Sequence, residues 1–349
     1  MELFVGARPT GTLSKQAEGL KLATTGRRDV MKFWTDLPGL YRYPPLFQPW
    51  QAQLRAADFQ LVARTADELG FDAITVPEHI VMPVGEVDLM GAYWTHALTA
   101  MSFIAGATTR IAVNASVIVL PYHHPVILAK AIATLDVLSG GRVIVSVGVG
   151  HTEREFEVLG VPFHERGRIA DDSLAAMIEL WTSEDPRHHS PFIDVDGVAF
   201  EPKPVQRPYP PVWIGGNSRA AMRRAARHDG WMPWLITLDQ LPECLAYIRS
   251  QPDFEGRTRP FDVSMSVTNV PVDEHHRPVE PELRRGSPTG AAAIVEAIGG
   301  LAEAGVTWTS IPQRPATSLE EHLDQLRWAA EEIIPAFRVA SVETGPTKD

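Results

Sequence analysis

The sequence predicts an α/β fold, a (β/α)8 barrel (TIM barrel) with insertions, and three observations support this prediction. Short apolar runs rich in β-branched residues alternate along the chain with longer segments of helical periodicity. This alternation calls for a parallel sheet, because a crossover helix must follow each strand. Eight such units fit within the 349 residues, which is enough to close a barrel. The sequence lacks GxGxxG followed by an acidic residue about 20 positions later, so an open dinucleotide-binding sheet is disfavoured.

The expected strands are short and mostly apolar. The fourth, VIVSV from Val143 to Val147, has the composition of a strand that is buried on both faces. The third, RIAVNASVIVL, is long and almost wholly apolar. In chain order, we expect strands at residues 2–7, 71–77, 110–120, 143–147, 212–214, 230–235, 261–270 and 306–311.

The segments between these strands have the spacing of amphipathic helices. Leu174, Met177, Ile178 and Trp181 follow an i, i+3, i+4, i+7 pattern, which is typical of a core-facing stripe and not of a cofactor site. Gly70 stands where a helix C-terminus favours glycine. We expect helices at residues 51–70, 93–108, 125–138, 168–181, 219–228, 291–304 and 319–337, and a helix start at residues 153–157.

Two segments do not fit the repeat and are expected to be insertions in a single domain that spans residues 1–349. Residues 8–50 are rich in prolines and aromatics, and a structureless segment of this length is usually functional or disordered. The aromatics argue against disorder, so the segment is either a lid over a pocket or an insertion that supports the outer surface or a partner subunit. Residues 182–210 are expected to contain a hairpin that turns at Asp196-Gly197.

Composition limits the possible partners. The net charge of -11 argues against nucleic acid, which requires a clustered basic surface. We find no apolar stretch of about 18 residues and no secretory leader pattern, so neither a membrane span nor a signal peptide is expected. The single cysteine, Cys244, excludes an intrachain disulfide and fits a reducing compartment. We therefore expect a cytoplasmic protein.

Hydrolase and metal chemistry find little support in the sequence. The GxSxG and HExxH signatures are absent. The paired histidines His123, His124, His188 and His189 lack acidic residues at a supporting spacing. We interpret them as surface or loop residues, and we expect no metal site.

A few residues at predicted strand ends could carry chemistry. His79 follows the strand at residues 71–77, where a histidine can exchange a proton near neutral pH or can be purely structural. Gly148 and Gly150 follow the fourth strand. Bare backbone there suits a phosphate or cofactor, and the alternative is a plain turn from strand to helix. Glu153, at the following helix start, could be an acid or base, or could simply favour the helix dipole.

A second glycine-rich turn follows the fifth strand. Gly215 and Gly216 precede Asn217 and Ser218 at a helix start, where unpaired N–H groups can bind an anion. The alternative is ordinary capping of the helix by Asn217 or Ser218.

Several of these segments together resemble one family. Glu78-His79, the Ser116-Val117 region, GVGHTEREFEVLGVPFHERGR and PPVWIGGNSRAAMRRAARHDGW occur in the order and spacing of the bacterial luciferase-like family. The resemblance extends over residues 51–335 and is closer to the deazaflavin (coenzyme F420) branch than to the FMN monooxygenases. It implies a barrel, usually in a homodimer, with the cofactor across the carboxyl ends of the strands.

The resemblance also implies roles for individual residues. It implies a non-prolyl cis peptide at Ser116 and Val117, behind the deazaflavin ring, and proton transfer by His79 or Glu153. Small residues of some relatives are replaced here by His151 and Thr152. The cofactor-binding positions would be Ser116, Val117, Gly148, Gly150, His151, Thr152, Gly215, Gly216, Asn217 and Ser218.

The function implied is an F420-dependent oxidoreductase. It would transfer a hydride between deazaflavin C5 and a small, hydrophobic organic substrate, an alcohol or carbonyl compound or an enone. A sugar phosphate stays an alternative because of loop cations such as Arg314. Two other interpretations remain open, a reduced-FMN monooxygenase that uses O2 and a non-catalytic flavin- or deazaflavin-binding protein.

Overall fold

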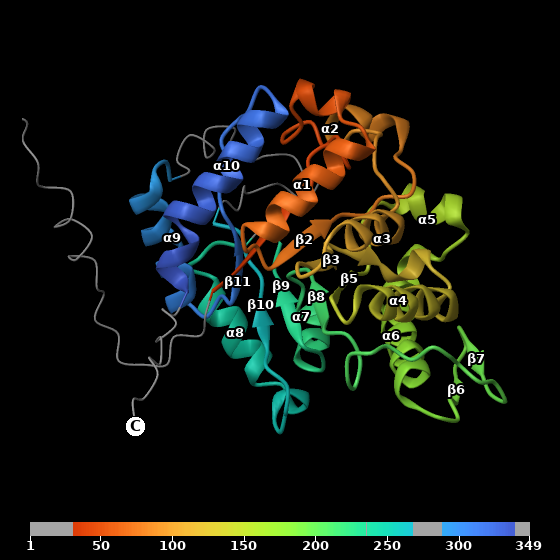
Figure 1. Ribbon diagram of the computed structural model, residues 1–349. Helices are drawn as coiled ribbons and strands as arrows, with labels where there is room; N and C mark the ends of the chain where they lie inside the picture. The colour runs from red at the N-terminus through yellow and green to blue at the C-terminus, as the bar shows by residue number, and fades with distance from the viewer. Residues whose placement is uncertain (1–30, 235, 268–287, 339–349) are drawn as a thin grey trace, which may run out of the picture.

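The computed structural model describes residues 31–234, 236–267 and 288–338, and in this part of the chain eight parallel strands form the predicted barrel (Figure 1). Neighbouring strands are hydrogen-bonded in the order β10-β9-β8-β5-β3-β2-β1-β11. A short additional strand, β4 (Ile118–Val119), pairs with β5. The barrel strands are β1 (Lys32–Asp36), β2 (Ala73–Val76), β3 (Ala112–Ala115), β5 (Val143–Gly148), β8 (Val212–Gly215), β9 (Gly230–Met232), β10 (Asp262–Val263) and β11 (Trp308–Ser310).

Hydrogen bonds between β10 and β11 bring the two ends of the sheet together. A parallel bridge joins Ser264 to Trp308. The N–H of Met265 donates to the carbonyl of Trp308 at 3.0 Å, and the N–H of Thr307 donates to the carbonyl of Val263 at 2.9 Å. The sheet therefore closes on itself, as a (β/α)8 fold requires.

The first barrel strand differs from the prediction. We expected it at residues 2–7, which lie outside the described residues. The structure instead has β1 at Lys32–Asp36, inside the segment that was predicted to be an insertion, and this strand pairs with both β2 and β11. Its sequence, KFWTD, alternates between buried and more accessible side chains, so it lacks the continuous apolar run by which the other strands were recognised.

Ten α-helices of the described chain surround the strands (Figure 1). The helix at 241–249 was not anticipated, and the first expected helix begins five residues later than predicted, at Ala56. The helices are α1 (Ala56–Glu68), α2 (Val87–Met90), α3 (Ala97–Ala107), α4 (Pro125–Ser139), α5 (Glu153–Leu159), α6 (Arg166–Thr182), α7 (Arg219–Ala226), α8 (Leu241–Arg249), α9 (Ala291–Glu303) and α10 (Leu319–Glu332). Short 3-10 turns occur at Pro49–Gln53, Val84–Glu86, Leu120–Tyr122, Phe163–Glu165, Pro252–Phe254 and Ile334–Phe337.

Tryptophans fill the interior of the barrel. Trp213 and Trp308 pack edge to face with ring centroids 5.1 Å apart, among Ala73 and Ile144. A Cβ atom at Gly230 would come within 2.4 Å of Trp213 Cδ1, so only glycine leaves room for the indole. The apolar faces of the helices pack around the outside of the sheet and form the larger core.

The insertion at residues 182–210 contains a hairpin, but its turn is not where we predicted. Strands β6 (His188–His189) and β7 (Asp194–Val195) pair antiparallel, so the turn spans residues 190–193 and not Asp196-Gly197. Ser190 Oγ accepts the N–H groups of Phe192 and Ile193 and stabilises this turn. No helix of the described chain is long and apolar enough to cross a membrane.

Candidate functional site

A cavity of about 860 Å³ opens at the carboxyl end of the barrel. Its volume is within the range of about 300–1,000 Å³ that is usual for small-molecule sites. Every barrel strand, or the loop that follows it, contributes to the wall. One residue from each, in chain order, is Asp36, His79, Ser116, Gly150, Gly216, Met232, Ser266 and Ser310.

His79 and Glu155 form a hydrogen-bonded pair at the wall of this cavity. The Nδ1 atom of His79 lies 3.1 Å from Oε2 of Glu155, and the two side chains are 10% and 0% exposed. Glu155 also accepts the Tyr122 hydroxyl at 2.9 Å and the backbone N–H groups of Ile80 and Val81. The carboxylate thereby fixes the orientation of the imidazole and of the loop that follows β2.

These hydrogen bonds keep Glu155 ionised. Burial by itself would raise the pKa of the Glu155 carboxyl, but the hydrogen bond and charge of His79 and the N–H groups of Ile80 and Val81 outweigh it and hold this pKa below its ordinary value. An ionised Glu155 accepts from Nδ1 of His79. Nε2 is then the ring nitrogen that can exchange a proton with a ligand.

A second histidine–glutamate pair lies next to the first. Glu78 is 3% exposed and accepts the N–H of Val119 at 2.8 Å. His123 Nε2 lies 3.0 Å from both of its carboxylate oxygens, and the His123 side chain is 15% exposed. His123 is therefore not the loose surface residue that we expected, but part of the buried support for the strand ends.

The structure does not bring Glu153 into the cavity. Glu153 begins α5 and is exposed, and it is not among the residues that line the cavity. Thr152, the N-cap residue of α5, is buried away from the lining, whereas His151 lines it and lies edge-on to His79 at 5.8 Å between ring centroids. The acidic partner of His79 is Glu155, two positions further along the same helix.

The chain bulges at Ser116 and Val117, because Asn114 pairs with Ile144 and Ile118 pairs with Val147, which leaves one extra residue opposite β5. The peptide bond between Ser116 and Val117 is cis, as predicted, and both residues line the cavity. A Cβ atom at Gly148 would lie 2.7 Å from Val117 Cγ2, and one at Gly215 would lie 2.9 Å from Val117 Cγ1. These two glycines therefore leave room for the Val117 side chain.

In the second glycine-rich turn, the cavity and the helix cap involve different residues. Gly215 and Gly216 line the cavity. The Ser218 hydroxyl caps α7 by accepting the N–H of Ala221 at 3.1 Å, and Asn217 Oδ1 accepts the N–H of Trp234 at 2.7 Å. Asn217 and Ser218 are outside the cavity lining. Ser218 is therefore a helix cap, as the alternative interpretation proposed. Asn217 instead fixes the loop after β9 through its hydrogen bond to Trp234.

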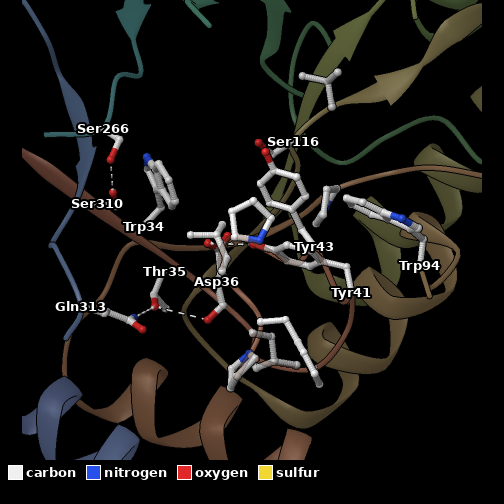
Figure 2. A pocket seen from close by; sticks show the side chains of 18 of the residues that line it. Trp34, Thr35, Asp36, Tyr41, Tyr43, Trp94, Ser116, Ser266, Ser310 and Gln313 are labelled. Atoms are coloured by element: carbon white, nitrogen blue, oxygen red, sulfur yellow. Dashed lines mark hydrogen bonds between the residues drawn. The ribbon is translucent and has the colours of Figure 1, made fainter. Parts of the chain in front are cut away.

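A carboxylate at the end of β1 was not predicted from the sequence. Asp36 lines the cavity, where its Oδ1 accepts the Thr75 hydroxyl at 2.6 Å and its Oδ2 accepts the Tyr41 hydroxyl at 3.3 Å. The Tyr41 ring stacks on Trp94 with 5.2 Å between the ring centroids. Trp94 and His79 pack in a T-shaped arrangement with 4.7 Å between their centroids. Figure 2 shows the Trp34 side chain on one side of Asp36 and the Trp94 side chain on the other. The signal in the sequence that could have identified this carboxylate is the run Trp34-Thr35-Asp36, in which an acidic residue follows an aromatic one at the end of a strand.

Residues 44–333 match the model of the luciferase-like monooxygenase family. The chain belongs to this family. The FMNH2-dependent dimethylsulfone monooxygenase of Pseudomonas putida is 35% identical to it over 140 residues, which are 39% of this chain and 37% of that protein.

Solved structures of low sequence identity share the fold of this luciferase-like protein. The monooxygenase RslO1 of Streptomyces bottropensis superimposes with a TM-score of 0.71 at 22% identity, over 88% of this chain and all of that one. An F420-dependent secondary alcohol dehydrogenase, solved with an F420–acetone adduct, gives a TM-score of 0.66 at 18% identity, over 89% of this chain and all of that one. Of the three proteins compared with this luciferase-like chain, the dimethylsulfone monooxygenase is FMNH2-dependent and the alcohol dehydrogenase is F420-dependent.

One part of the cavity wall offers backbone and an apolar surface to a ligand. Gly148, Gly150, Gly215 and Gly216 all line it, so no side chain projects from these positions, and Val117 forms an apolar surface between them. Backbone groups exposed at such glycines are suitable partners for the polar edge or the phosphate of a cofactor. Among the described residues, no group of three or more His, Cys, Asp or Glu side chains is placed to hold a metal ion.

Proposed function

We propose that this luciferase-like protein is an F420-dependent oxidoreductase that transfers a hydride between deazaflavin C5 and a small organic substrate. The observation that carries the proposal is the His79–Glu155 pair in the wall of the cavity that also contains the Ser116–Val117 bulge. A reduced deazaflavin supplies the hydride, or an oxidised one accepts it. The remaining chemistry is the transfer of one proton, which His79 is suited to perform.

The residues of this chain have separate roles in the proposed reaction. Glu155 holds Nδ1 of His79, so Nε2 gives a proton to a substrate oxygen or nitrogen during reduction, or takes one during oxidation. Trp94, packed against the edge of His79, fixes the imidazole ring and keeps water away from it. Val117 and the glycines support the cofactor ring. Glu153 has no part in this scheme, because it is exposed and outside the cavity lining.

A titration with two cofactors tests the proposal. The purified protein is titrated with F420 and, separately, with FMN, and the quenching of protein or cofactor fluorescence is followed. We expect saturable F420 binding that is about tenfold or more tighter than FMN binding, an affinity ratio equal to about 1.4 kcal/mol. Gly215→Leu, which fills the space beside Val117, is expected to abolish binding. Binding of FMN in preference to F420 would contradict the proposal.

The alternative is a monooxygenase that uses reduced FMN and O2. The similarity to the FMNH2-dependent dimethylsulfone monooxygenase favours it. Oxygen uptake distinguishes the two, because only the monooxygenase consumes O2 in proportion to product. The protein is assayed anaerobically and in air with chemically reduced F420 and reduced FMN. Turnover that requires both reduced FMN and O2 would establish the alternative.

A further inference from the structure

Asp36 is a carboxylate in the wall of the cavity with no cationic partner in the described chain. Its two hydrogen-bond donors, the hydroxyls of Thr75 and Tyr41, are neutral, and the bond from Tyr41 is long at 3.3 Å. A carboxylate can accept about four hydrogen bonds. Asp36 therefore retains capacity for another donor on the side of the cavity.

The environment of Asp36 makes an unpaired negative charge costly. Burial raises the pKa of the Asp36 carboxyl, and the hydrogen bonds from Thr75 and Tyr41 offset this effect only in part. A charge removed from water is stabilised mainly by an opposite charge at short range. A cation that enters the cavity would provide one.

Three aromatic side chains lie in the same part of the cavity as this carboxylate. Tyr41, which bonds to Asp36, is stacked on Trp94, and the side chain of Trp34 lies on the other side of the carboxylate (Figure 2). All three rings belong to residues that line the cavity. Indole and phenol faces attract organic cations, and most strongly where water is excluded.

The charges elsewhere in the lining also favour a cation over an anion. Among the described residues that line the cavity, Arg314 is the only lysine or arginine, and it is exposed with its guanidinium over the Trp328 ring at 5.3 Å. The carboxylate of Glu78 is already hydrogen-bonded by His123 and by the N–H of Val119. The inner cavity thus presents to a ligand the carboxylate of Asp36, with no lysine or arginine beside it.

We propose that Asp36 and the rings of Trp34, Tyr41 and Trp94 form a recognition site for the ammonium group of an amine substrate. This inference rests on the proposed function, because it identifies the substrate class of the same cavity. The stacking from Tyr41 through Trp94 to His79 connects the ammonium site to the proton-transferring residue. A basic nitrogen bound at Asp36 would therefore be held on the same side of the cavity as His79.

Three probes that share a 2-phenylethyl group and differ in charge test this site. They are 2-phenylethylammonium, 2-phenylethanol and 3-phenylpropanoate, and their binding to the full chain is measured by calorimetry at neutral pH, with and without F420. We expect the ammonium to bind about tenfold or more tighter than the alcohol, because it gains both the ion pair and the cation–π contacts. The carboxylate is expected to bind most weakly. An alcohol that binds as tightly as the ammonium would overturn the inference.

Two variants localise the preference. In Asp36→Asn the ammonium-to-alcohol affinity ratio is expected to fall to about one, because the amide keeps the shape but removes the charge. The matched control is Asp324→Asn, which removes an exposed carboxylate of the lining that pairs with Arg327 and should leave the ratio unchanged. An unchanged ratio in Asp36→Asn would overturn the inference. Thermal unfolding shows whether that variant folds. If it does not, the order of the affinities of the three probes for the native chain still tests the inference.

The two proposals fail in different measurements. F420 binding without a preference for the ammonium would overturn the amine site and leave the proposed function intact. Ammonium preference without F420 or FMN binding would overturn the proposed function and support Asp36 as a cation site.

Discussion

Glu155 Oε2 lies 3.1 Å from Nδ1 of His79, although 76 positions separate the two residues in the chain. The same carboxylate accepts the Tyr122 hydroxyl and the N–H groups of Ile80 and Val81. One buried charge thereby joins the loop after β2 to the 3-10 turn after β4 and to α5. The orientation of His79 and the order of the cavity rim depend on this one side chain.

Glu155→Gln should destabilise the protein markedly. An amide cannot accept all four of these hydrogen bonds as a carboxylate does, and donors left buried without a charged acceptor cost free energy. We expect the free energy of unfolding in urea to fall by about 2–3 kcal/mol. Glu157→Gln, on the same helix but 56% exposed, should change it by less than about 0.5 kcal/mol. Equal effects of the two substitutions would show that the contacts of Glu155 are energetically unimportant.

Gly148→Ala should disturb the bulge at Val117. The added methyl would lie 2.7 Å from Val117 Cγ2, and such overpacking costs about 1–3 kcal/mol. Removing the opposing methyl groups with Val117→Ala should restore most of that loss in the double variant. Unfolding in urea of the four chains gives the coupling free energy. Gly106→Ala, in α3 where nothing lies within 4 Å of the new methyl, is the control and should be neutral or stabilising. Strict additivity of the two changes would refute the clash.

The alternation of strands and helices was sufficient to predict the barrel, but not its first strand. Continuous apolar runs marked strands such as β5, whose two faces are buried. Lys32–Asp36 alternates instead, because Trp34 and Asp36 face the barrel interior and the cavity. The hairpin turn was placed wrongly for a different reason. Asp196-Gly197 is a strong local turn signal, yet hydrogen bonds of Ser190 determine where the chain reverses.

The site could be located from the sequence but not resolved to individual side chains. His79, Ser116, Val117 and the glycines are all in the cavity lining, because carboxyl ends of parallel strands meet at one end of a barrel. Choosing between Glu153 and Glu155 requires the orientation of α5. Residues two apart on a helix point about 200° away from each other, so one faces the protein and the other faces solvent. Only the packed structure shows that Glu155 faces the protein and Glu153 faces solvent.

Acid pH should destabilise the protein through two buried histidines. Burial lowers the pKa of His322 from 6.5 to about 4, and burial together with Arg227 and Arg224 does the same to His228. Between these pH values the unfolded chain binds protons that the folded chain does not. The free energy of unfolding therefore falls as the pH falls from 6.5 to about 4, by up to about 3 kcal/mol for each histidine.

Urea unfolding at several pH values across this window isolates the contribution of one histidine. His322→Gln should lose less stability than the native chain as the pH falls, and the two curves should become parallel below about pH 4. His189→Gln, which replaces a histidine with a 62% exposed side chain, is the control and should follow the native curve. If His322→Gln also follows the native curve, the buried His322 does not resist protonation.

Proton transfer by His79 predicts a specific contrast between two substitutions. His79→Gln keeps a polar side chain of similar length but cannot exchange a proton. If F420-dependent turnover of a substrate is found for the native chain, it should therefore fall by about 10²–10⁴-fold in this variant. F420 affinity, measured by fluorescence titration, should change little, because in the proposed mode of binding Val117 and the glycines would support the ring. Glu153→Gln should leave both quantities unchanged, since Glu153 is exposed and outside the lining. A loss of turnover in Glu153→Gln that matches the loss in His79→Gln would return proton transfer to Glu153. Full turnover in His79→Gln would instead mean that the substrate exchanges its proton with water.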